Sequence, residues 1–429
     1  MSPTPDSAHR TVEAVWRMES ARIIGGLARF LRDVGLAEEL AQDALVAALE
    51  QWPRDGVPDN PGAWLMASAK HRAVDLVRRR VLHERKRDEL AFEIESQLQD
   101  VAPNLEAAID AAFDDPIGDD TLRLAFIACH PVLSREARVA LTLRLLGGLT
   151  TDEIARAFLA PEPTIAQRIV RAKRTLAEAR VPFEVPSAAE LPTRLSSVLE
   201  VLYLVFNEGY AATAGDDWVR PALCDEALRL GRILAERMSA ESEVHGLVAL
   251  MEIQASRMRA RVGPRGEPIL LMDQDRSRWD RLLIGRGLAA LERAEALGAP
   301  SGGLGRYALQ AEIAACHARA PSGDATDWAR IAALYDALAE LTPSPVVELY
   351  RAVALAMAFG PAAGLEVVDG LIAEPQLAGY HLLPSVRGDL LSKLGRRDEA
   401  RAEFERAAGL TRNERERELL LARAAACGK

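Results

Sequence analysis

The spacing of apolar residues is the feature of this 429-residue sequence that most restricts its fold. Leucine, alanine and other apolar residues recur three and four positions apart along almost the whole chain, and convincing alternating patterns are absent. A repeat near 3.6 residues places apolar side chains on one face of a helix, whereas a strand needs a repeat of two. The sequence therefore predicts an all-α fold.

Length and composition predict several domains in an aqueous compartment. A chain of this length exceeds one compact core and favours roughly two to four domains. With 49% hydrophobic and 27% charged residues, most of it can fold, and no apolar run is long enough to span a bilayer. The residues before Val12 contain no apolar run either, which argues against a secretory signal. We expect a soluble, cytoplasmic protein that makes no contact with a membrane.

The usual signatures of metal sites and catalysis are missing from the sequence. Cys129, Cys224, Cys316 and Cys427 are far apart, with no Cys-x-x-Cys pair and no His/Cys cluster. The seven histidines are dispersed, and no glycine-rich phosphate loop or Ser/His/Asp arrangement can be paired from spacing. We therefore expect no metal, no cofactor and no enzymatic activity.

Proline, glycine and charge divide the chain into regions. Three prolines and two glycines between positions 52 and 62 predict a loop within a first helical domain, residues 10–87. The following residues, 88–120, hold eleven Asp or Glu and no Lys or Arg, which indicates an acidic linker. A second helical domain is expected over 121–183, and a long helical region over 188–429.

Residues 149–176 read as a helix-turn-helix. Thr150 or Thr151 can cap a short first helix, Ala160 to Glu162 make the turn, and Pro163 suits the first turn of a second helix. Along that second helix the inward positions at helical spacing are Ile165, Ile169, Ala172 and Leu176. A helix in the major groove reads bases with N-terminal polar residues and binds phosphates with later basic ones. The expected base readers are Thr164, Gln167 and Arg168, and the expected phosphate contacts are Arg171, Lys173 and Arg174.

A second basic helix is predicted upstream, over residues 60–87. Between Lys70 and Arg87 there are eight Lys or Arg and two acids, although the whole chain has a formal net charge of −10. Trp64, Leu65 and Ala69 begin an apolar stripe at helical spacing. The residues expected to face DNA phosphates are Lys70, Arg72, Arg78, Arg79 and Arg80. For each basic helix taken alone, a solvated surface is the plain alternative.

Together these segments resemble a sigma factor of the extracytoplasmic-function (ECF) type, over about Val12 to Arg180. "LAEELAQDALVAALEQW", from Leu36, is similar to the family's helix that docks on core RNA polymerase. The resemblance implies polymerase contacts at matching positions, which are Glu38, Glu39, Gln42 and Asp43.

The resemblance extends to two promoter-binding elements. "AWLMASAKHRAVDLVRR" is similar to the helix that reads and melts the minus-ten element, with His71 where the family usually has Asn. It implies that the loop 54–60 holds a base flipped from the duplex. The helix-turn-helix is similar to the domain that binds the minus-thirty-five element. The implied partners are core RNA polymerase and promoter DNA.

The region after residue 188 is longer than ordinary members of this family need. Small residues at Gly388, Gly395, Ala400 and Ala407 suit closely packed antiparallel helices and resemble a tetratricopeptide unit, at least over 327–425. Helical solenoids bind proteins or peptides. We expect a regulatory module that contacts the sigma domains within the chain, and whether it activates or inhibits stays open.

Two other functions fit parts of the sequence. One is a helix-turn-helix regulator with a tetratricopeptide sensor that does not replace the sigma subunit, and the other is a helical enzyme. The helices around Glu38 and Trp64 favour the sigma factor, because a plain regulator needs neither. Polar clusters after Asn207 and over 272–280 fit a ligand or metal site, but turn and capping chemistry explains them equally well.

Overall fold

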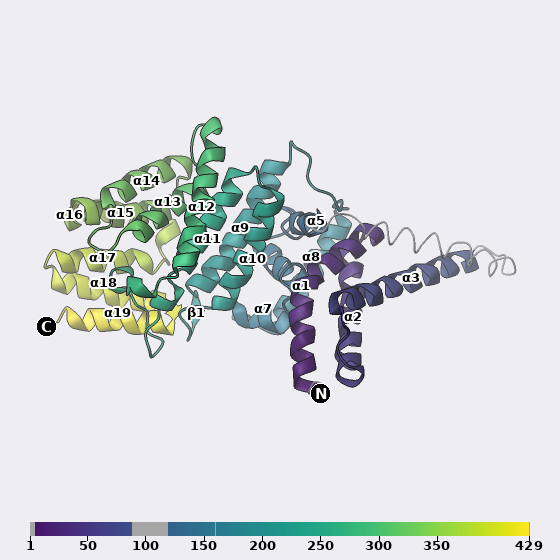
Figure 1. Cartoon of the computed structure of the whole chain (residues 1–429). Helices are drawn as coiled ribbons and strands as arrows, with labels where there is room; N and C mark the ends of the chain where they lie inside the picture. Colours follow the sequence, from purple (N-terminus) through teal and green to yellow (C-terminus); the bar gives the residue numbers. More distant parts are fainter. Residues whose placement is uncertain (1–4, 88–118, 159, 429) are drawn as a thin grey trace. The chain divides into compact units, whose positions relative to one another are not determined.

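The computed structural model describes residues 5–87, 119–158 and 160–428 (Figure 1). They belong to two units, Met1–Val201 and Leu202–Lys429. Apart from one pair of two-residue strands, the regular elements of this described part are helices, which confirms the all-α prediction. No helix in it is long and apolar enough to cross a membrane. The predicted acidic linker, 88–120, lies outside the described residues except for its last two positions.

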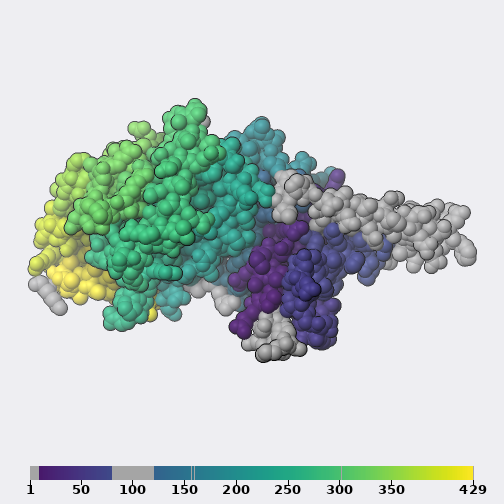
Figure 2. Space-filling view, in the orientation of Figure 1, coloured from purple at the N-terminus to yellow at the C-terminus, as the bar shows by residue number. Residues whose placement is uncertain are grey.

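The first unit begins with helices that pack closely on one another. Its helices are α1 (Pro5–Leu31), α2 (Val34–Asp55), α3 (Pro61–Arg87), α5 (Asp119–Ala128), α6 (Arg135–Leu145), α7 (Thr151–Ala157), α8 (Glu162–Glu178) and the start of α9 (Leu191–Tyr210). Figure 2 shows α1 in purple beside the blue atoms of α2 and α3. Ile24, Leu27 and Trp52 are almost completely buried in this unit. Their burial supplies apolar stabilisation that positions α2 and α3.

The loop between α2 and α3 is shorter than the sequence predicted. Helix α2 continues through Pro53 to Asp55, and the N–H of Gly56 bonds to the carbonyl of Trp52. Pro53 has no backbone N–H to donate, but it lies in the last turn of α2, where the remaining backbone hydrogen bonds maintain the helix. Gly56 then ends the helix with a φ of 91°, a conformation that suits glycine.

The second unit consists of helices that pack mainly on their neighbours in sequence. They are α10 (Pro221–Arg237), α11 (Ser242–Ala255), α12 (Arg281–Gly298), α13 (Arg306–Arg319), α14 (Trp328–Leu341), α15 (Pro345–Phe359), α16 (Pro361–Gly370), α17 (Leu382–Lys393), α18 (Arg397–Leu410) and α19 (Glu414–Ala426). Short 3-10 turns are η1 (Met258–Ala260), η2 (Leu271–Asp273), η3 (Arg276–Arg278), η4 (Ala299–Ser301) and η5 (Pro375–Leu377). Two acids of 272–280 act as caps: Asp275 accepts the N–H of Ser277, and Asp280 accepts the N–H groups of Leu282 and Leu283.

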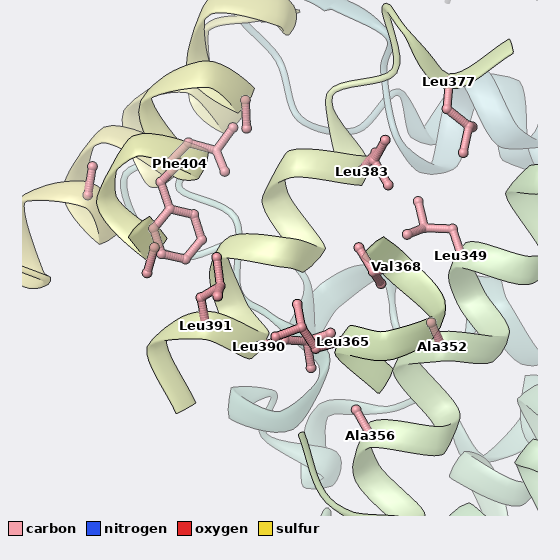
Figure 3. Close-up of a cluster of buried hydrophobic side chains, with 14 of the residues drawn as sticks. Leu349, Ala352, Ala356, Leu365, Val368, Leu377, Leu383, Leu390, Leu391 and Phe404 are labelled. Carbon is pink, nitrogen blue, oxygen red and sulfur yellow. The ribbon is translucent and has the colours of Figure 1, made fainter. Parts of the chain in front are cut away.

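Helices α15 to α19 enclose an apolar core (Figure 3). Phe404 of α18 lies beside Leu391 of α17, and both are buried. A Cβ added at Gly388 would lie 3.0 Å from the Phe404 ring, so glycine allows these helices to approach closely. Gly395 provides the intervening turn with a φ of 79°. Two of the small residues noted in the sequence, Gly388 and Gly395, therefore allow the close approach and the turn of this helix pair.

A two-residue parallel strand pair joins the two ends of the second unit. β1 (Ala214–Gly215) pairs with β2 (Arg412–Asn413). Asn413 is 0% exposed, and its amide nitrogen donates to the carbonyls of Ala212 at 3.0 Å and Asp217 at 2.9 Å. These bonds connect the loop after α9 to the last helix.

Candidate polymerase and nucleic-acid interfaces

The residues expected to bind polymerase lie in the first half of α2. Asp33 caps this helix by accepting the N–H three residues further along, at 3.0 Å. Glu39 and Asp43 are exposed, and Gln42 is half-buried. Glu38 is different, because only 4% of it is exposed. The helix therefore presents two of its three predicted acids to solvent.

Two cations surround the buried carboxylate of Glu38 and offset the cost of removing it from water. Arg144 of α6 donates from Nε to Oε1 at 2.9 Å, and Lys173 of α8 donates from Nζ to Oε2. Burial lowers the pKa of Lys173, which nearby Asp33 opposes, and burial also lowers the pKa of Arg144. The structure thus joins Glu38 and Lys173, which the sequence assigned to different partners.

A second contact links α1 to the helix-turn-helix. Arg17 donates to Glu153 at 2.7 Å, and both side chains remain partly exposed. Neither Arg144 nor Arg17 was singled out in the sequence. Arg144 and Glu38 are 106 positions apart, so no local spacing could have paired them.

Helix α3 is positioned by a cap and by an aromatic contact. The side chain of Asn60 accepts the N–H of Ala63 at 3.1 Å, and Pro61 follows as the first helical residue. Trp64 packs edge-on against Trp52 of α2, with ring centroids 5.6 Å apart. Together with buried apolar residues, Leu65, Ala69 and Ala73, this contact fixes which face of α3 is exposed.

The predicted DNA-facing residues of α3 differ in exposure. His71 and Arg79 are exposed, whereas Lys70, Arg72 and Arg78 are half-buried. Arg80 lies in α3, but its side chain is outside the described residues. Arg72 lies 3.9 Å from Asp43, and Arg78 lies 3.9 Å from Asp75. Such surface ion pairs are weak and exchange readily for phosphate.

A pocket of about 330 Å³ lies beside the first turns of α3. It is lined by Glu19, Arg22, Asn60, Gly62, Ala63, Met66, Ala67 and Lys70. Of the loop expected to hold a flipped base, 54–60, only Asn60 contributes to it. The pocket therefore lies between α1 and α3, next to that loop, and combines charged groups with three apolar side chains.

The helix-turn-helix has the two helices that the sequence predicted, although Glu162, expected in the turn, is the first residue of α8. Thr150 accepts the N–H of Glu153 at 3.1 Å, while the Glu153 carboxylate accepts the N–H of Thr150 at 2.8 Å. This reciprocal capping box starts α7. In α8 the buried residues are Ile165, Ile169, Ala172 and Leu176, as expected. The other face exposes Thr164, Gln167, Arg171 and Arg174, whereas Arg168 and Lys173 are half-buried.

Comparisons with known proteins identify these two helical regions. Residues 16–82 match the family Sigma-70 region 2, and residues 123–176 match Sigma-70, region 4. The ECF RNA polymerase sigma factor SigK of Mycobacterium ulcerans is 32% identical over 159 residues, which are 36% of this chain and 78% of SigK. The chain belongs to the ECF RNA polymerase sigma factors. This sigma factor binds core RNA polymerase and promoter DNA, and supplies promoter recognition rather than catalysis.

Two further relatives show how far the similarity extends. An uncharacterized protein of Rhizobium meliloti is 44% identical over 390 residues, 91% of this sigma factor and 89% of that protein. The probable ECF RNA polymerase sigma factor SigI of Mycobacterium tuberculosis is 27% identical over 211 residues, 46% and 68% of the two chains. Residues 194–295 match a family of unknown function, DUF6596. No solved structure matches.

These comparisons decide between the functions left open by the sequence. The region 2 match covers the helices that a plain helix-turn-helix regulator does not need, so the sigma-factor prediction is confirmed. The helical-enzyme alternative is wrong for the same reason. The Rhizobium meliloti relative aligns with 91% of the chain, so it shares most of the extension after region 4.

Proposed function

We propose that α8 binds the minus-thirty-five element with the face that carries Thr164, Gln167 and Arg171. The observation that supports this is the division of α8 into a buried apolar face and an exposed polar one. Thr164, Gln167 and half-buried Arg168 lie near its N-terminus, where base edges are read, and the later cations Arg171 and Arg174 suit phosphates. Lys173 takes part once it leaves Glu38.

We further propose that α2 and α3 provide the polymerase contact and the minus-ten contact. Exposed Glu39 and Asp43, with Gln42 and Glu38, would bind cations of core polymerase. The basic residues Lys70, His71, Arg72 and Arg78 to Arg80 would follow the backbone of the opened promoter, with His71 setting a base preference. The sigma factor would act in the bacterial cytoplasm, where it meets the polymerase.

Run-off transcription with core polymerase and a library of promoter fragments tests these assignments. Start sites sharing two upstream elements are expected. Gln167→Ala should change the preferred upstream sequence, whereas Arg171→Ala should weaken all promoters similarly and reduce the salt slope of binding by about one. Arg401→Ala, an exposed residue of the second unit, is the control. Sequence preference unchanged by Gln167→Ala, Thr164→Ala and Arg168→Ala together would remove α8 as the reader.

We propose that the second unit regulates these activities within the same chain. Its support is the length of folded structure that has no counterpart in region 2 or region 4. Deleting everything after Val185 would not test this cleanly, because the start of α9 belongs to the first unit. There Arg194 donates to the carbonyl of Phe126 at 2.7 Å, and Ser197 donates to that of Cys129.

A substitution in the full chain gives a cleaner test of regulation. Asn413→Ala removes the bonds that join the two ends of the second unit and leaves the first unit intact. Limited proteolysis confirms that the second unit has loosened. If the variant then makes as much promoter-specific RNA as the wild type, the second unit does not regulate transcription. More RNA from the variant indicates that the intact second unit inhibits the sigma factor, and less RNA indicates that it activates it.

A further inference from the structure

Glu38, Arg144 and Lys173 form a buried ionic cluster between region 2 and region 4 of the first unit. The carboxylate comes from α2, and the two cations come from α6 and α8. The side chain of Glu38 is 5% exposed, against 17% for Arg144 and 21% for Lys173. One carboxylate oxygen faces each cation, so both oxygens already have a charged partner.

A more exposed contact connects the same two regions. Arg17 of α1 pairs with Glu153 of α7 at 2.7 Å. Just before α7, a Cβ added at Gly148 would lie 2.8 Å from the hydroxyl of Ser20, so the chain passes close to α1. Gly148 has a φ of 65°, a backbone conformation that residues other than glycine rarely adopt. Region 4 therefore contacts both α1 and α2.

These contacts compete with the partners proposed for the same residues. A cation of core polymerase cannot reach Glu38 while Arg144 and Lys173 cover its carboxylate, because the side chain is only 5% exposed. A DNA phosphate cannot approach Lys173 while the Glu38 carboxylate holds its ammonium, because like charges repel. The closed contact and the two binding reactions use the same atoms, so they exclude one another at these positions.

We propose that Glu38, Arg144 and Lys173 form a latch that keeps the free sigma factor closed and opens when core polymerase binds. The latch rests on the proposed roles of Glu38 in polymerase binding and Lys173 in DNA binding. Glu39 and Asp43 remain exposed on α2, so polymerase can make first contact there before Glu38 is released. When only a fraction of the molecules is open, the apparent dissociation constant for polymerase equals the intrinsic one divided by that fraction.

The chemistry of the cluster makes it suitable for opening. Removing one member of a buried ion pair leaves an unpaired charge inside the protein. Separating Glu38, Arg144 and Lys173 instead returns all three charged groups to water. The desolvation cost offsets much of the attraction, so the closed state has only a modest advantage. New ion pairs with polymerase and DNA can exceed it.

Chemical cross-linking detects the latch directly. A carbodiimide joins the Lys173 amine to the Glu38 carboxylate with loss of water, and mass spectrometry identifies the amide. The amide is expected in the free, full-length sigma factor and should fall about tenfold when core polymerase is bound. The amide between Lys393 and Asp389, an ion pair within α17 at 2.9 Å, is the matched control and should stay constant.

A substitution measures the effect on polymerase binding. Arg144→Gln has no assigned contact with polymerase or DNA and should tighten core binding about tenfold, within the range of ~5–150-fold typical of allosteric coupling. Arg144→Lys keeps the cation and should restore most of the wild-type affinity. Arg401→Gln removes an equal charge from an exposed pair in the second unit and should leave the affinity unchanged.

Arg144 also donates to the carbonyl of Leu149 at 3.1 Å, so its replacement could disturb the fold. Arg17→Gln, on the surface, provides a second variant that should tighten binding by a smaller factor. If both variants bind core polymerase like the wild type, or the Glu38 amide persists in the polymerase complex, the latch is wrong. If the wild type does not bind core polymerase through α2, the polymerase face itself is wrong, and the latch falls with it.

Discussion

Two groups of buried arginines in the sigma factor, one around Glu38 in the first unit and one around Tyr210 in the second, are stabilised in different ways. In the first unit, Arg144 shares the carboxylate of Glu38 with Lys173. In the second unit, Arg257 and Arg261 form no ion pair among the described residues. The guanidinium of Arg261 lies 3.7 Å from the centroid of the Tyr210 ring, and Arg257 donates to the Tyr210 hydroxyl at 2.7 Å.

The difference is that a partner protein can replace the cations at Glu38 but cannot replace the arginines around Tyr210. A carboxylate accepts any suitable cation, so a partner protein can replace Arg144 or Lys173. Aromatic rings instead enclose Arg257 and Arg261: Arg261 also faces Trp218 at 5.6 Å, and Arg257 faces Trp279 at 5.8 Å. Such cation–π contacts depend on packing and little on salt. The first arrangement suits a switch, and the second suits a permanent structure.

The largest effect is expected for Arg261→Ala. This change removes two aromatic contacts and the bond to the Tyr210 carbonyl at 3.0 Å, and should lower the free energy of unfolding of the second unit by about 3 kcal/mol. Urea denaturation at 0.05 and 0.5 M NaCl should give the same loss. Arg415→Ala, from an exposed ion pair, is the control. A loss that disappears at high salt would mean that the arginines around Glu38 and around Tyr210 do not differ as described.

The next effect is a pH dependence centred on His317. Burial, with Arg257 and Arg276 nearby, lowers the pKa of His317 to about 4. In the unfolded chain its pKa is about 6.5, so the unfolded state binds more protons between these values. Stability should therefore fall as the pH drops from about 6.5 toward 4, by about 2 kcal/mol at pH 5.

Replacing His317 by Gln should remove this part of the pH dependence. The measured quantity is the change in unfolding free energy of the second unit between pH 7 and pH 5, for wild type and variant. His245→Gln, which changes a half-buried histidine of the same unit, should behave like the wild type. Identical pH profiles for His317→Gln and wild type would show that this imidazole also binds a proton in the folded state.

A smaller effect is expected from salt on the latch. Chloride and sodium ions screen the cluster around Glu38 only in part, because it is largely buried. Raising NaCl from 0.05 to 0.5 M should favour the open state by about 1 kcal/mol. The affinity advantage of Arg144→Gln over the wild type should therefore shrink from about tenfold to about twofold. A constant ratio would indicate that the substitution acts through something other than the ionic contact.

The fold of α8 was predictable from sequence because its pattern is local. The four buried residues of α8 recur at helical spacing, and in neighbouring α7 the capping box joins residues three positions apart. Similarly, Gly388 and Phe404 were recognisable because small and large residues alternate over one helical hairpin. In such segments the chain neighbours of a residue determine which side of the helix is buried.

The latch and the strand pair were not predictable, because distant residues create them. Lys173 is 135 positions from Glu38, and Asn413 is 201 positions from Ala212. Glu38 has the same sequence character as Glu39, yet only the tertiary packing of α2 against α6 and α8 buries one and exposes the other. The residue types were correct, but their partners depend on packing that local patterns do not encode.

The smallest effect, Arg17→Gln, tests where the energy of the closed state resides. The side chain of Arg17 is 54% exposed and that of Glu153 is 29% exposed, so their pair should contribute about 0.5 kcal/mol. Core polymerase should bind Arg17→Gln about twofold more tightly than wild type. Arg22→Gln, on the same helix, is the control, since Arg22 pairs with Glu19 within α1.

The ratio of the Arg17 and Arg144 effects distinguishes two kinds of closed state. If the buried cluster dominates, Arg144→Gln exceeds Arg17→Gln about fivefold, and combining them adds little once the cluster is broken. If both substitutions have equal effects, the two regions are held by diffuse surface attraction, and Glu38 is buried only as a consequence. A double-mutant cycle on core binding measures this coupling directly. Only a dominant cluster gives polymerase a single position, Glu38, through which opening can be controlled.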